Sequence, residues 1–262
     1  MLPTSGFASL TLAQLHIDDE EAFRPVGLYA DLKEIIDRAG LTFRVLPTPL
    51  GGRWDRALFL NLAYWSADGG GDVLVDDHIA ADVVTHVAWH HLTARALPTA
   101  PGAQASAESL FLGESIASAF DLYLVGRLLG HDTESQFLET QVPAMADTAS
   151  AAGLDEAGFE ALLDSVSKDP ERAFEDLREL LFDAATALLA CRTAEQAMTA
   201  LEPLDRHRFA PLLHHYELAT WVLDARSRSG QLGPDEAVRA IDRTLREAPV
   251  ALDWLEKTWV TL

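Results

Sequence analysis

Residues 82–93 read DVVTHVAWHHLT, a run in which apolar and imidazole side chains recur with helical spacing. His86 and His90 stand four residues apart, which places both on one face of an α-helix. Asp82 precedes His86 by one turn. The surrounding side chains are apolar, so the run predicts a helix from about residue 79 to about residue 97 with a polar stripe along it. Such a stripe indicates either a ligand site or histidines that are satisfied core or surface residues.

A second helix is predicted over residues 106–130, and it is apolar on almost every side, which is typical of a buried helix. It nevertheless carries Glu114 and Asp121, seven residues apart and on roughly the same face. Buried carboxylates are costly unless they are paired, hydrogen-bonded or bound to a metal. Two imidazoles and one carboxylate form a known catalytic zinc set with a fourth position for water. Without a metal, Glu114 would hydrogen-bond one of the histidines or pair with an arginine such as Arg95.

The elements around these two helices indicate the fold class. Residues 24–40 predict a helix that ends at Gly40, and strands are predicted over 41–48, 56–66 and 72–76. After a loop over 97–106, further helices are predicted near 133–150, 155–166, 170–191, 193–201, 206–228, 234–247 and 249–260. We therefore expect an α+β fold. A small mixed sheet with the motif helix would occupy residues 1–100, and a mainly helical part with the glutamate helix would occupy residues 101–262.

Composition narrows the classes of partner. The net charge is −21, from 41 acidic and 20 basic residues, which disfavours nucleic acids and anionic membranes. Cys191 is the single cysteine, so no disulfide can form within the chain. The N-terminal residues do not resemble a signal peptide, and no membrane span is expected. We therefore expect a cytoplasmic protein whose partner is an unknown protein or peptide. The sequence contains no signature of the chain's oligomeric state.

The two helices together resemble the zincin metallopeptidases, specifically the gluzincins to which thermolysin belongs. In that family a strand leads into a helix with the motif His-Glu-x-x-His, and a later helix supplies a glutamate ligand. The resemblance covers roughly residues 40–130, with DVLVD as the strand, THVAWHH as the motif and GESIASAF as the glutamate helix. It implies zinc as the cofactor and His86, His90 and Glu114 as its ligands. It also implies an edge strand for extended peptide within residues 56–66.

The motif is degenerate at two positions. The family's glutamate after the first histidine accepts a proton from the zinc-bound water, and Val87 stands in its place. Ser118 stands where the family has an aspartate that orients a ligand histidine, and Asp82 or Asp121 could substitute for it. The resemblance also implies an oxyanion donor from the C-terminal half. The residues of suitable type there are His214, His215 and Tyr216.

These observations predict a degenerate zincin-like pseudoenzyme that retains a zinc site, lacks efficient peptidase activity and acts by binding. Two alternatives stay open. One is a metal-free helical interaction protein whose histidines are core residues. The other is an active metal-dependent hydrolase with a displaced general base, for which Glu108 and His91 are available without the family geometry. Asp76 and Asp77, just before the motif helix, are interpreted as helix-capping residues rather than metal ligands.

Overall fold

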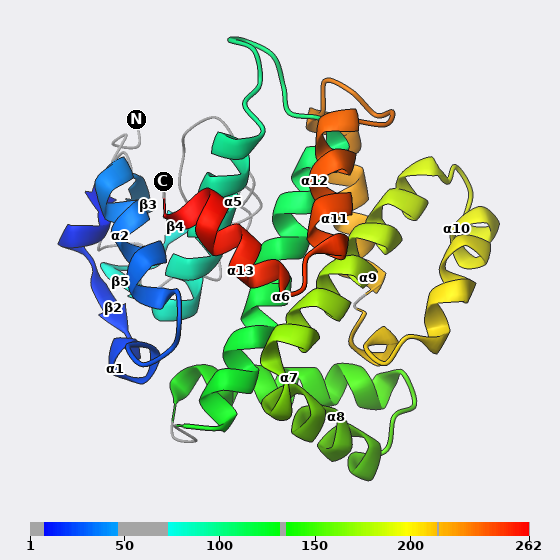
Figure 1. The fold of residues 1–262 in the computed structure, drawn as a ribbon, viewed down its shortest axis with the longest axis horizontal. Coiled ribbons are helices and arrows are strands. Elements are labelled where there is room, and N and C mark those ends of the chain that lie inside the picture. Colours follow the sequence, from blue (N-terminus) through cyan, green and yellow to red (C-terminus); the bar gives the residue numbers. More distant parts are fainter. Residues whose placement is uncertain (1–7, 47–72, 132–134, 214, 262) are drawn as a thin grey trace, which may run out of the picture. The chain divides into compact units, whose positions relative to one another are not determined.

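The computed structural model of the chain describes residues 8–46, 73–131, 135–213 and 215–261 (Figure 1). Short strands lie in the N-terminal part and helices make up the rest, so the predicted α+β class is confirmed. The chain divides into two compact units, Met1–Ala88 and Trp89–Leu262. This division falls inside one unbroken helix, α5 (Ala81–Ala96), which is the predicted motif helix.

The first unit contains a three-stranded mixed sheet in the order β1-β3-β4. Strand β1 (Ala8–Thr11) pairs antiparallel with β3 (Thr42–Val45), and β4 (Val73–Leu74) pairs parallel with β3. The strands predicted over 41–48 and 72–76 correspond to β3 and β4, each shorter than expected. The strand predicted over 56–66 lies outside the described residues.

A separate pair of parallel strands was not predicted from the sequence. It consists of β2 (His16–Asp18) and β5 (His78–Ala80). The capping interpretation of Asp76 and Asp77 is wrong, because β5 separates them from the start of α5. Instead, the Asp76 carboxylate accepts a hydrogen bond from the His78 backbone amide, and the Asp77 carbonyl accepts one from the His16 amide. Strands of three residues are too short to produce a clear alternating pattern.

Two helices pack within the first unit. Helix α1 spans Glu20–Phe23, and α2 spans Tyr29–Ala39, so the helix predicted over 24–40 begins five residues later than expected. Gly40 ends α2 with a φ of +62°, a left-handed conformation that glycine adopts without steric cost. The hydrophobic core of this unit includes these fully buried side chains: Phe23, Leu32, Ile36, Phe43 and Ile79.

The second unit is built around helix α6 (Ala107–Leu129), which confirms the helix predicted over 106–130. The Ser106 hydroxyl caps its start by accepting a hydrogen bond from the Ser109 amide, and Gly130 follows its end. Figure 1 shows α6 in green through the middle of this unit, with α9 (Pro170–Ala190) packed beside it. Its other partners are α7 (Gln136–Ala151), α8 (Glu156–Lys168), α11 (His215–Arg228) and α12 (Glu236–Glu247).

Two further helices of the second unit contact α9. They are α10 (Ala194–Leu201) and α13 (Ala251–Leu255), the latter followed by a π-helical turn over Glu256–Val260. The prediction of a continuous helix over 206–228 is wrong for the first part of that range. Turns of 3₁₀ helix at Glu202–Arg206 and Ala210–Leu212 precede α11 instead.

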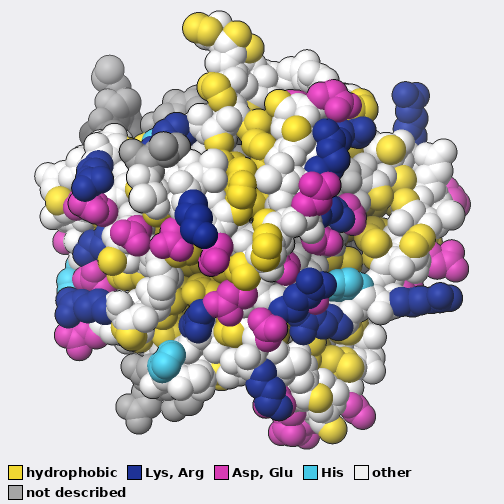
Figure 2. All heavy atoms as spheres, in the orientation of Figure 1, with side chains coloured by type: hydrophobic (Ala, Val, Ile, Leu, Met, Phe, Trp, Pro, Cys, Tyr) yellow, Lys and Arg dark blue, Asp and Glu magenta, His cyan; other side chains and the backbone are white. Residues whose placement is uncertain are grey.

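Helix α6 is long and apolar enough to cross a membrane, unlike the other helices in the described part of the chain. However, 83% of its apolar window is buried inside the protein. Burial by neighbouring helices is typical of the central helix of a soluble domain, and it accounts for the apolar composition without a membrane. Figure 2 shows acidic and basic side chains interspersed over the face that it draws.

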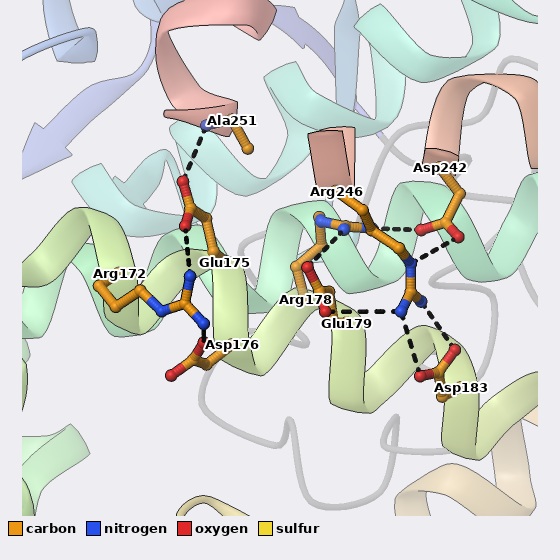
Figure 3. Close-up of polar contacts among 9 residues, drawn as sticks. All are labelled: Arg172, Glu175, Asp176, Arg178, Glu179, Asp183, Asp242, Arg246 and Ala251. Carbon is orange, nitrogen blue, oxygen red and sulfur yellow. Dashed lines mark hydrogen bonds and ion pairs between the residues drawn. The ribbon is translucent and has the colours of Figure 1, made fainter. Parts of the chain in front are cut away.

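A network of ion pairs joins α9 to α12 (Figure 3). The guanidinium of Arg178 is 0% exposed, and its Nη1 lies 2.7 Å from Asp242 Oδ1. Arg246 contacts the other oxygen of Asp242 at 2.8 Å and also reaches Asp183 on α9 at 2.7 Å. Because each buried charge has an opposite charge beside it, the network fixes how α12 lies on α9.

Candidate metal centre

Helix α5 presents the two histidines one turn apart, as the sequence predicted. Its packed side is formed by apolar residues that are completely buried: Val84, Ala88, Trp89 and Leu92. The Trp89 ring lies edge-on to Phe120 of α6, with ring centroids 5.4 Å apart. This packing fixes the rotation of α5 about its axis, so His86 and His90 keep partial access to solvent while their helix lies against α6.

Glu114 of α6 joins the two histidines. One ligand atom from each of His86, His90 and Glu114 can be chosen so that all lie within 4.8 Å of one another. His90 Nε2 is 3.0 Å from Glu114 Oε2. Glu114 is only 5% exposed, whereas about a third of the His90 side chain is accessible. The three residues therefore form a cluster with a buried carboxylate on one side and accessible imidazole on the other.

Two imidazoles and one carboxylate are a donor set that can hold a divalent metal ion. Two ligand atoms that bind a tetrahedral zinc at about 2.0–2.1 Å lie about 3.3 Å apart. The 3.0 Å between His90 Nε2 and Glu114 Oε2 is close to this separation. His86, His90 and Glu114 would hold the metal, which in such sites polarises a bound water and lowers its pKa.

Ser118 contacts Glu114, whereas the resemblance gives this position to an aspartate that orients a ligand histidine. Its hydroxyl donates a hydrogen bond to Glu114 Oε1 at 2.9 Å, one turn along α6. The other carboxylate oxygen, Oε2, faces His90. Ser118 therefore contacts the candidate ligand Glu114 directly, whereas the family's aspartate would contact a ligand histidine.

Gly113 allows α6 to approach α5 at the cluster, and sequence reasoning missed it. A Cβ at this position would lie 3.3 Å from Thr93 Cγ2 and 3.5 Å from His90 Nδ1. The first distance is shorter than an ordinary contact between two carbons, so any larger residue here must push Thr93 aside. The signal in the sequence was a glycine directly before the buried Glu114, inside an otherwise unbroken helix.

The other residues considered for this site have different positions. Asp82 lies in the first turn of α5, and Asp121 lies on α6 two turns after Glu114. Val87 follows His86 on α5 and is partly exposed. Its side chain can neither accept nor donate a proton, so it cannot activate water. Arg95, the predicted alternative partner, donates a hydrogen bond from its Nη2 to the Trp259 carbonyl.

Two residues had been considered as replacement bases. Glu108 is buried and engaged by Arg239, whose Nη2 lies 2.9 Å from Glu108 Oε1, and it also accepts a hydrogen bond from the Asp235 amide. These contacts stabilise the ionised carboxylate as a structural ion pair. Burial lowers the pKa of His91, and the nearby Arg95 lowers it further. His91 points away from the i, i+4 face because it directly follows His90.

The predicted oxyanion donors are largely outside the described part of the chain. His214 is not among the described residues. His215 and Tyr216 begin α11, and their side chains are likewise outside the description. Their assignment stays a prediction.

Comparisons with known proteins identified no relative. No protein-family model matches the chain, and no curated protein and no solved structure shows significant similarity to it. Interpretation of the cluster therefore depends on its own residues and their geometry.

Proposed function

We propose that this chain is a zinc-binding protein with the ligand set of a gluzincin-like zincin that has lost its general base. His86, His90 and Glu114 would bind the metal. The protein would act by binding a protein or peptide in the cytoplasm, and it would hydrolyse peptides poorly at best.

The observation that carries this proposal is the arrangement of the three side chains. Their potential ligand atoms lie within 4.8 Å of one another, and a buried carboxylate completes a pair of imidazoles on one helix face. A carboxylate buried in an apolar helix requires a compensating positive charge or hydrogen-bond donors. A divalent cation that also uses both histidines supplies that charge.

The absence of activity is inferred from Val87. A zinc-bound water can reach a pKa near 7 without help, but general acid–base assistance typically adds about 10²–10⁴-fold to the rate. The chain would therefore keep the metal and the fold while losing most of the rate of hydrolysis. An active hydrolase would need another base, and Glu108 is already paired with Arg239.

A metal-free role is the second candidate, and the contact between His90 and Glu114 favours it. At 3.0 Å, His90 Nε2 can satisfy Glu114 Oε2 directly, and Ser118 satisfies the other oxygen. In that case the cluster would be a polar contact between α5 and α6 in a helical interaction protein.

Metal content distinguishes the two candidates. The untagged full-length protein, dialysed extensively, would be assayed for zinc by mass spectrometry beside His86→Ala, Glu114→Gln and the control His131→Ala, which removes an exposed histidine outside the cluster. We expect about one tightly bound zinc per chain in the wild type and the control, and none in the two site variants. Zinc should also raise the melting temperature of the wild type, because a ligand at 100 times its Kd stabilises a protein by about 2.7 kcal/mol. A wild type that, after zinc addition, binds no more zinc than His86→Ala and Glu114→Gln would reject the proposal.

A further inference from the structure

A second cluster of potential metal ligands lies on the parallel strands β2 and β5. The register places His16 directly opposite His78. Asp18 follows His16 by two residues, so its side chain leaves the strand on the same face. The backbone pairing of the two strands thus brings His78 beside His16 and Asp18, which lie about sixty residues earlier in the sequence.

The side chains of this cluster converge on the Asp18 carboxylate. His78 Nδ1 lies 2.8 Å from Asp18 Oδ1, and His16 Nε2 lies 3.7 Å from the same oxygen. The two imidazole rings meet edge to face, with centroids 4.7 Å apart. One ligand atom from each residue can be chosen so that all three lie within 4.8 Å of one another.

The chemistry of these three groups matches a borderline divalent cation. Imidazole nitrogens suit zinc, copper and nickel, and a carboxylate supplies charge to the same ion. Both histidines are exposed, so water can fill the remaining coordination positions. The adjacent Asp76 and Asp77 add negative charge, which favours a cation at this edge of the first unit.

We propose that His16, Asp18 and His78 form a second, surface site for a divalent transition-metal ion. The site binds Zn²⁺, and it binds Cu²⁺ more tightly because affinity for nitrogen ligands rises towards copper. All three residues belong to the unit Met1–Ala88 and none belongs to the cluster of His86, His90 and Glu114. The inference therefore does not depend on the proposed function.

The test is a titration with Zn²⁺ alone, followed on two independent signals. The untagged full-length protein carrying His90→Ala, which removes a ligand of the first cluster, serves as the background. Four substitutions are introduced into this background one at a time: His16→Ala, His78→Ala, Asp18→Asn and the control His131→Ala. Competition with a chromophoric chelator measures stoichiometry and affinity, and ¹⁵N-detected imidazole spectra identify the ring nitrogens that shift.

We expect one Zn²⁺ per chain in the His90→Ala background, with the imidazole signals of His16 and His78 shifting first. Loss of even a ligand-orienting group weakens metal binding about 10–100-fold, so removal of either histidine should weaken it at least tenfold. Asp18→Asn should do the same while preserving side-chain shape, and His131→Ala should leave the affinity unchanged.

Two outcomes would overturn the inference. One is the absence of saturable Zn²⁺ binding in the His90→Ala background, which would leave an ion pair between Asp18 and His78 only. The other is binding that survives both histidine substitutions with unchanged affinity. Failure of the first cluster to bind zinc would be seen separately, as wild-type stoichiometry equal to that of the His90→Ala background.

Discussion

Ser118 Oγ lies 2.9 Å from Glu114 Oε1, and this hydrogen bond leaves Glu114 Oε2 directed at His90. The two residues are one turn apart on α6, so the helix itself sets their separation. A carboxylate that is held through one oxygen loses rotational freedom before it binds anything through the other. The serine is therefore a positioning residue for the proposed metal ligand.

Removal of that hydroxyl should weaken zinc binding. We expect Ser118→Ala to lower zinc affinity about 10–100-fold, because the partner that orients a ligand typically contributes this much. Chelator competition measures the change. The matched control is Ser115→Ala on the same helix, since the buried Ser115 hydroxyl donates to the Leu112 carbonyl and not to Glu114. Equal zinc affinity in Ser118→Ala and the wild type would contradict the positioning role.

A methyl group at Gly113 should separate α6 from α5 at the cluster. The added Cβ would meet Thr93 Cγ2 at 3.3 Å, so Thr93 and the neighbouring His90 must shift. We expect Gly113→Ala to weaken zinc binding by roughly the tenfold that a misplaced ligand costs. Global stability should change little, because alanine is favoured over glycine in a helix by about 1 kcal/mol and offsets part of the strain.

A compensating substitution tests the steric explanation. Thr93→Ser removes the Cγ2 methyl that the new Cβ would contact. The double variant Gly113→Ala with Thr93→Ser should therefore recover most of the zinc affinity. If the double variant binds no better than Gly113→Ala alone, the close approach of α5 and α6 does not control the geometry of the cluster.

The long helices of the second unit were predictable because their signals are local. Ser106 and Gly130 bound an apolar segment, and the structure places α6 between them. Pro170 occupies the first turn of α9, as its position in the sequence indicated. The helical period alone predicted that His86 and His90 share a helix face. The apolar residues around Glu114 alone predicted that its carboxylate is buried.

Features that depend on distant pairing could not be predicted in the same way. His78 lies just before the start of the predicted motif helix, whereas the structure places it on a strand that pairs with residues about sixty positions earlier. Arg178 gave no sign of burial within its helix, and its partner Asp242 lies 64 residues later. Loop closure over such distances is determined by the whole fold, and a local pattern carries no information about it.

The buried ion pair between Arg178 and Asp242 should be essential for stability. Arg178 is 0% exposed, so Asp242→Asn would remove its close 2.7 Å partner and leave only the longer 3.6 Å contact with Glu179. Breaking such a pair typically costs about 3–5 kcal/mol. The control is Arg172→Ala, whose side chain is 63% exposed where it pairs with Asp176, and whose loss should cost about 0–1 kcal/mol. Urea unfolding measures both, and similar losses in the two variants would contradict the argument.

His207 should make stability depend on pH. Burial lowers the pKa of His207, and its Nδ1 accepts a hydrogen bond from the Phe209 amide at 3.2 Å. The unfolded chain therefore binds a proton at higher pH than the folded chain does. Above the ordinary histidine pKa of about 6.5, the neutral His207 imidazole contributes fully to the free energy of unfolding. As pH falls below that value, protonation favours the unfolded state and this contribution is lost.

His207→Asn removes the titration and keeps an acceptor for the amide two residues on, as in an Asx turn. We expect the free energy of unfolding of the wild type to fall more steeply than that of the variant between about pH 7 and the lowered folded-state pKa. His131→Asn is the control, because His131 is exposed. Parallel stability curves for wild type and His207→Asn would show that the buried imidazole is not linked to folding.

Val87→Glu should restore the missing proton acceptor one residue after His86. If zinc is bound and the cluster is accessible through His90, the zinc-loaded variant should hydrolyse peptide or ester substrates about 10²–10⁴-fold faster than the wild type. Val87→Gln is the control, since it has nearly the same shape and no basic carboxylate. The gain should disappear with chelator and with His90→Ala. A zinc-loaded Val87→Glu protein no faster than Val87→Gln would show that Val87 is not what limits hydrolysis, and the proposal of a hydrolase that has lost its general base would fail.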